Sequence, residues 1–153
     1  GVRTIEHASF AGEGGFGTDL DEDLMRELAE REVWVSPTVN AGWLARAVDA
    51  SGAPSDFFRR LSRCLELQRG HGVRFIASSD AGIPGVFHHA LVDGLRALQR
   101  YAGMRPVDVL RAATCEAARA LGVAGETGLA VVFRGRWLEP AALLAGTGDG
   151  LPG

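Results

Sequence analysis

Apolar residues in this chain form short runs and longer stripes of helical period, and the two patterns follow one another. Short runs predict β-strands at residues 2–5, 33–35 and 72–77. Stripes in which apolar residues recur every three or four positions predict helices at residues 20–28, 56–68, 91–102 and 106–121. The order strand, helix, strand, helix, strand, helix, helix favours an α/β fold class with parallel strands.

Capping residues set the expected ends of these helices. Thr18-Asp19 and Ser55-Asp56 are typical N-caps, and Pro106 suits a first helical turn. Glycines that can take a left-handed conformation mark the expected helix ends, at Gly70, Gly103 and Gly122. The stretch from Asn40 to Pro54 gives no clear pattern.

Composition indicates one globular domain. The chain has 153 residues, of which 46% are hydrophobic and 23% charged, with a mean hydropathy of +0.06. A net charge of -3 and a pI of about 5.8 give no basic field for nucleic acid or anionic lipid. No apolar run approaches the roughly 20 residues of a membrane helix. We therefore expect neither nucleic acid nor a membrane as partner.

Three smaller features bear on compartment and chemistry. Cys64 and Cys115 lie in helix-like segments, which suits buried thiols in a reducing cytoplasm, and we expect a cytoplasmic protein. Every basic residue is arginine, so no mechanism can use a lysine of this chain. The chain starts Gly1-Val2 without an initiator methionine, which favours an origin within something longer.

Two polar residues follow strands directly or closely, His7 after the first and Asp80 after the third. Ligands and catalytic groups gather at such carboxyl ends in α/β sheets and barrels. Imidazole and carboxylate are both zinc ligands, and a carboxylate can also take a proton from water. A hydrogen-bonded structural histidine and a helix-capping aspartate are the alternatives.

Other candidate residues are less specific. His88 and His89 follow Asp80, either at the mouth of a site or as a cap or surface pair before the next helix. His71 stands at a helix C-terminus, where a partly cationic ring favours the helix dipole. The glycines from Gly12 to Gly17 do not form the G-x-G-x-x-G pattern of a dinucleotide site.

Four segments together resemble the metal-dependent amidohydrolase superfamily, in its imidazolonepropionase-like and prolidase-like branch. Thr4-Ile5-Glu6-His7 is similar to the sixth barrel strand and Ser36-Pro37-Thr38 to the end of the seventh. The stretch 79–85, Ser-Asp-Ala-Gly-Ile-Pro-Gly, resembles the eighth strand and its loop, and residues 102–122 resemble the closing helices. The resemblance runs from about residue 2 to residue 128.

The resemblance implies the C-terminal part of a (β/α)8 TIM barrel, about strands six to eight. Such enzymes hold one or two divalent metal ions, commonly Zn²⁺, and hydrolyse an amide, cyclic amide or dipeptide C–N bond of a small-molecule substrate through a metal-activated water. Asp80 would be metal ligand and general base. His7 would be a metal ligand or, in a one-metal member, a hydrogen-bond partner of the attacking water. Thr38, His88 and His89 would contact substrate.

The chain also departs from the family. The H-x-H pair of the first strand, the histidine of the fifth and the bridging lysine are absent, and a full barrel takes roughly 250 residues. We expect residues 1–128 to be a partial barrel that is inactive alone, needing the missing N-terminal part or a homo-oligomer. The resemblance stops at a divergent tail, 129–153, which is either frame-shifted or disordered. A non-catalytic remnant or interaction module and a barrel phosphoesterase are the alternative functions.

Overall fold

The computed structural model describes residues 1–126, and the tail expected at 129–153 lies outside them. Within the described residues, the strands are β1 Thr4–Glu6, β2 Trp34–Ser36 and β3 Arg74–Phe75. They form one sheet in the order β1-β2-β3, with both neighbouring pairs parallel. The described chain is therefore a small α/β domain with a parallel sheet, and the eight-stranded barrel stays a prediction.

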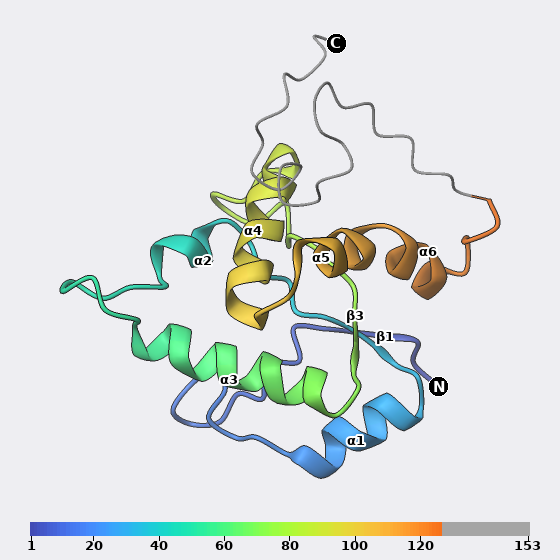
Figure 1. The fold of residues 1–153 in the computed structure, drawn as a ribbon, viewed down its shortest axis with the longest axis horizontal. Helices are drawn as coiled ribbons and strands as arrows, with labels where there is room; N and C mark the ends of the chain where they lie inside the picture. The colour runs from blue at the N-terminus through green and yellow to red at the C-terminus, as the bar shows by residue number, and fades with distance from the viewer. Residues whose placement is uncertain (127–153) are drawn as a thin grey trace, which may run out of the picture.

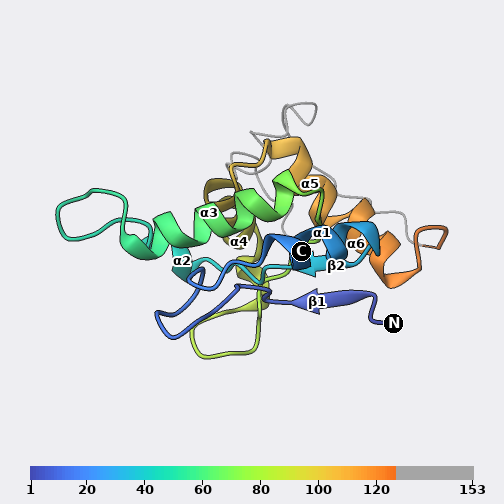
Figure 2. The same cartoon turned by 90° about the horizontal axis from the view of Figure 1, so that it is seen from below.

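The helices pack on one another. They are α1 Glu22–Glu30, α2 Gly42–Ala45, α3 Asp56–Gly70, the short 3-10 helix η1 His88–Ala90, α4 Leu91–Ala102, α5 Pro106–Ala113 and α6 Cys115–Leu121. α1 contacts α3, α3 contacts α4, and α4 leads through α5 to α6, so that the helices form a continuous layer (Figure 1). Figure 2 shows β1 at the rim of the molecule. In the described part of the chain, no helix is long and apolar enough to cross a membrane.

The two faces of the sheet differ in cover. Ile5, Val35 and Phe75 are in register across the three strands and belong to the apolar core under the helices. Helical core residues pack in the same cluster, among them Met25, Leu28, Leu61, Leu65, Leu95, Leu98 and Tyr101. On the alternate positions, Glu6 and Arg74 are exposed. Ser36, which lies opposite Glu6 on this second face, is nevertheless buried, so the face is open only in part, whereas purely parallel sheets normally have both faces covered.

Two predicted caps are wrong. The N-cap of α1 is Asp21, whose carboxylate accepts the Leu24 N–H at 2.9 Å, so the helix starts later than Thr18-Asp19 predicts. α3 continues through Gly70 to a C-cap at His71, and it is Gly72 that takes the left-handed conformation, at φ 87°. In both places a residue of the same type two positions further along takes the predicted role, Asp21 in place of Asp19 and Gly72 in place of Gly70.

The predicted helix over 106–121 is broken in two. Thr114 leaves helical geometry, at φ -127° and ψ -93°, and separates α5 from α6. Its hydroxyl donates to the Leu110 carbonyl at 2.7 Å, a local bond that competes with the helix ladder. The other expected boundaries are confirmed, with Ser55 capping α3, Pro106 in the first turn of α5, and Gly103 and Gly122 left-handed.

Both cysteines are free thiols, as predicted. Cys64 is buried in the packed side of α3, and Cys115 is half-buried at the start of α6. His71, expected to favour the helix dipole, also lies 2.9 Å from Glu22 through its Nε2 atom and so joins α3 to α1.

Candidate functional site

Three of the predicted site residues lie beyond the carboxyl ends of the three parallel strands. His7 follows β1 directly, Thr38 follows β2 after one residue, and Asp80 follows β3 after an extended segment. All three take a left-handed backbone conformation, with φ of 67°, 51° and 57°. This conformation is uncommon outside glycine, and for a β-branched threonine it is a genuine outlier. The strand ends therefore hold a row of strained backbone positions along one edge of the sheet.

His7 and Thr38 are in direct contact. Thr38 Oγ1 lies 2.6 Å from His7 Nδ1, and the His7 backbone N–H donates to the Ser36 carbonyl at 2.7 Å. Thr38 is buried, with 6% of its surface exposed, whereas His7 is an exposed residue. One side of the imidazole is thus fixed against the sheet while the residue remains open to solvent.

Asp80 is carried by the segment that continues β3. The Ile76 N–H donates to the Val35 carbonyl and the Ala77 N–H to the Ala112 carbonyl, each at 3.0 Å, so the segment is tied to both β2 and α5. Ser78 adds a side-chain hydrogen bond to Ser36, which is fully buried. The Asp80 carboxylate is half-buried. None of residues 1–126, His7 among them, forms a hydrogen bond or an ion pair with it.

The turn after His7 is supported from α3 by two buried side chains. Gln68 Nε2 donates to the Ala8 carbonyl at 3.2 Å, and the Cys64 thiol lies 3.8 Å from the Ser9 carbonyl. Ala8 itself is left-handed, at φ 43°. Burial raises the pKa of the Cys64 thiol, against an opposing hydrogen bond from Gln68. Sequence analysis missed this support, although a glutamine on the apolar stripe of a helix was a visible signal.

His88 and His89 lie in η1 and are exposed. The His89 ring stacks on Phe87, with centroids 5.4 Å apart and planes at 6°. Neither histidine caps the following helix, because the N-cap of α4 is Ala90, without a side-chain bond. The capping interpretation is therefore wrong. The exposure of His88 and His89 is compatible with the two other predicted roles, a pair on the surface and a contact with substrate.

His7 and Asp80 carry donor atoms that suit a divalent metal ion, but two residues are too few for a usual catalytic site. Imidazole nitrogen and carboxylate oxygen are ordinary zinc donors, and a catalytic zinc usually has three protein ligands. In residues 1–126, no group of three or more histidine, cysteine, aspartate or glutamate side chains is placed to hold a metal ion. The described chain therefore offers two donors at most, and further ligands would have to come from elsewhere.

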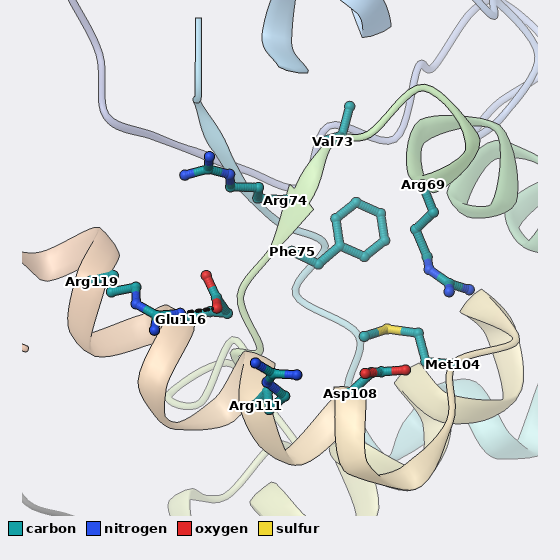
Figure 3. Close-up of a pocket in the computed structure, with 9 residues that line it drawn as sticks. All are labelled: Arg69, Val73, Arg74, Phe75, Met104, Asp108, Arg111, Glu116 and Arg119. Carbon is teal, nitrogen blue, oxygen red and sulfur yellow. Dashed lines mark hydrogen bonds and ion pairs between the residues drawn. The ribbon is translucent and has the colours of Figure 1, made fainter. Parts of the chain in front are cut away.

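A groove of about 590 Å³ lies away from these strand ends, along β3 and between α3, α5 and α6 (Figure 3). Its lining includes Arg69, Arg74, Arg111 and Arg119, with Asp108 and Glu116. Most of these cations are engaged: Arg119 pairs with Glu116, Arg74 pairs with Glu32, and Arg69 donates to the Ala102 carbonyl. Sequence analysis did not single out this groove, because its residues come from four separate segments.

Comparison with known proteins gives a likeness at the level of fold. No protein-family model matches the chain, and no curated protein matches it. The structure is similar to a Xaa-Pro dipeptidase solved with methionine in its active site, at 22% identity and a TM-score of 0.57, covering 82% of this chain and 30% of that chain. The chain therefore shares its fold with part of that structure.

A second solved structure, of an uncharacterized protein, is similar at 22% identity and a TM-score of 0.63, covering 95% of this chain and 37% of that chain. The chain therefore spans between 30% and 37% of the length of these two structures. At such identity the likeness concerns the fold, and the chemistry has to be argued from the residues.

Proposed function

We propose that the chain is part of a metal-dependent hydrolase that cleaves C–N bonds of amide, cyclic amide or dipeptide substrates. The observation that carries this proposal is the strained row of His7, Thr38 and Asp80 at the carboxyl edge of the parallel sheet. Strained non-glycine residues cluster at active sites, and carboxyl edges are where α/β proteins bind ligands. The dipeptidase-like fold supports the same class of reaction.

Each residue has a distinct part in this reaction. Asp80, half-buried and without a partner among the described residues, is free to accept a proton from an attacking water and to pass it to the leaving nitrogen. His7 presents an imidazole nitrogen from the neighbouring strand, as ligand or as hydrogen-bond partner of that water. A divalent ion such as Zn²⁺ would supply Lewis acidity. His88 and His89, exposed in the loop after Asp80, are proposed to face the substrate.

The open sheet supports completion by further chain. Among the described residues, β1 and β3 are edge strands, and Glu6 and Arg74 leave part of the second face exposed. Unpaired parallel edges with a partly uncovered face are what a barrel would show if cut open. We propose that the missing strands and metal ligands come from a preceding part of the barrel or from another copy of this chain. The 153 residues alone would then have no turnover.

The test begins with the gene and its flanking sequence, from which the longest verified reading frame is expressed. We expect the long protein to bind zinc and to hydrolyse members of a panel containing Xaa-Pro dipeptides, cyclic amides and simple amides. The isolated chain should do neither. Turnover of amides by the isolated chain would contradict its expected inactivity. Turnover of phosphoesters alone by the long protein would favour the barrel phosphoesterase instead.

Asp80→Asn is the decisive variant of the long protein. It removes the charge and the proton acceptor with little change in shape, so we expect turnover to fall by about 10²–10⁴-fold. Asp23→Asn is the matched control, because Asp23 lies in the first turn of α1, where it pairs with Arg26. Near-normal turnover in Asp80→Asn would remove Asp80 from the mechanism.

The non-catalytic alternative has its own supporting observation, the shortage of metal donors in the described chain. A remnant or interaction module would retain the scaffold without chemistry. Stop codons on both sides of a verified 153-residue frame, together with no bound zinc, would favour that function over hydrolysis.

A further inference from the structure

Thr38 has two polar neighbours and one hydroxyl proton. Its Oγ1 lies 2.6 Å from His7 Nδ1 and 2.8 Å from the Pro37 carbonyl oxygen. A carbonyl oxygen can only accept a hydrogen bond. If the hydroxyl proton pointed at His7, two oxygen atoms would face each other at 2.8 Å with no proton between them. The hydroxyl therefore donates to Pro37.

This assignment decides the proton on the histidine ring. With its own proton directed at Pro37, the Thr38 hydroxyl meets His7 Nδ1 with a lone pair. A short contact of this kind is favourable only when Nδ1 carries a hydrogen. We infer that Thr38 is a positioning residue that holds neutral His7 in the tautomer with Nδ1 protonated and Nε2 open as an acceptor.

Both partners are held in place by the sheet rather than by each other. Thr38 is buried between Pro37 and Val39, which are buried too, and its branched side chain has few rotamers open to it. Its left-handed backbone, at φ 51°, persists only because the surroundings determine it. His7 is anchored by its own N–H on Ser36. The hydroxyl is thus presented to the ring at a fixed place.

The consequence for chemistry rests on the proposed function. The open Nε2 is the atom that a metal ion or an attacking water would use, because Nδ1 is occupied by Thr38. In the opposite tautomer Nε2 would carry a hydrogen and could not coordinate a metal. The tautomer of His7 can be measured without metal or substrate.

The test is side-chain NMR of the full 153-residue chain labelled with ¹⁵N. Long-range ¹H–¹⁵N correlations separate the two neutral tautomers, and the spectra are recorded at about pH 8, above the ordinary histidine pKa of about 6.5. The chain has 4 histidines, and His7→Gln identifies the signals of His7 by their loss. We expect the Nδ1–H form to predominate at His7. Predominance of the Nε2–H form would overturn the inference.

Two variants separate the hydroxyl from the shape of the side chain. Thr38→Val keeps the branched shape and removes the hydroxyl, so the Nδ1–H form should lose its predominance, whereas Thr38→Ser keeps the hydroxyl and should preserve it. An unchanged tautomer in Thr38→Val would overturn the inference. If Thr38→Val does not fold, Thr38→Gly replaces it, because glycine removes the hydroxyl and also relieves the left-handed backbone.

The outcomes distinguish this inference from the proposed function. A predominant Nδ1–H form that depends on the Thr38 hydroxyl supports the positioning role even if the long protein hydrolyses nothing, in which case the proposed function fails alone. A turnover-competent protein whose His7 is predominantly the Nε2–H form leaves the proposed function standing and removes the role of Thr38.

Discussion

Gly17 offers a sharp test of how the loop after His7 is placed. The loop docks on α3, and a Cβ atom added at Gly17 would lie 2.8 Å from the backbone carbonyl oxygen of Arg60. Gly17 is also left-handed, at φ 70°, and its N–H donates to the Ser9 carbonyl at 2.8 Å. Gly17→Ala therefore combines backbone strain with a clash against a helix backbone that cannot move aside.

Gly15→Ala is the matched control. Gly15 belongs to the same loop and has φ 94°, but a Cβ atom there would meet nothing within 4 Å. Both substitutions place alanine at positive φ, at a cost of about 1–2 kcal/mol. Both also gain about 0.4–1 kcal/mol from a less flexible unfolded chain. Only Gly17→Ala adds overpacking, at about 1–3 kcal/mol.

The expected difference between the two variants is therefore about 1–3 kcal/mol in the free energy of unfolding, with Gly17→Ala the less stable. Equilibrium unfolding in urea measures it, provided that the denaturant slope is the same for both variants. Equal stability of the two variants would refute the packing of this loop on α3. The support that Gln68 gives to the turn after His7 would then be in doubt as well.

Two further predictions concern buried side chains. Tyr101→Phe removes the 2.8 Å hydrogen bond from the Tyr101 hydroxyl to the Trp43 carbonyl and should lower the free energy of unfolding by about 1 kcal/mol. Tyr101→Ala also removes the buried ring and should lower it by about 3–5 kcal/mol. Urea unfolding measures both changes. Because burial raises the pKa of Cys64, the unfolded chain loses that proton first as pH rises, and stability should fall above about pH 8.5. Cys64→Ala should flatten this fall, and an unchanged slope would show that another group causes it.

Much of the scaffold follows from local signals in the sequence. The first turn of a helix leaves backbone N–H groups without partners. Ser55 caps α3 because its side chain accepts one of these N–H groups. Pro106 opens α5 because proline has no N–H that would need a partner there. The break at Thr114 was missed because apolar spacing continues across it, while the competing hydroxyl bond to Leu110 depends on the actual turn. Local pattern predicts which elements form, and tertiary packing decides where some of them stop.

The residues of the candidate site could be predicted from the sequence, but their geometry could not. Position after a strand was enough to select His7 and Asp80, and Thr38 was selected by the family resemblance. Their left-handed backbones and the contact between His7 and Thr38 depend on the register of three strands that are distant in sequence. The contacts of Gln68 and Cys64 could not be predicted from the helical pattern, because their carbonyl partners follow a strand about sixty residues earlier.

Backbone strain alone does not mark these strand ends as a site. Glu32 is also left-handed, at φ 53°, yet it lies in the tight turn between α1 and β2, where chain reversal explains the conformation. No such turn is needed at Thr38, a buried β-branched residue for which the left-handed region is costly. Its conformation instead accompanies a hydroxyl placed on the ring of His7. The coincidence of strain, burial and a polar contact at one sheet edge is therefore what favours a functional role over a purely structural one.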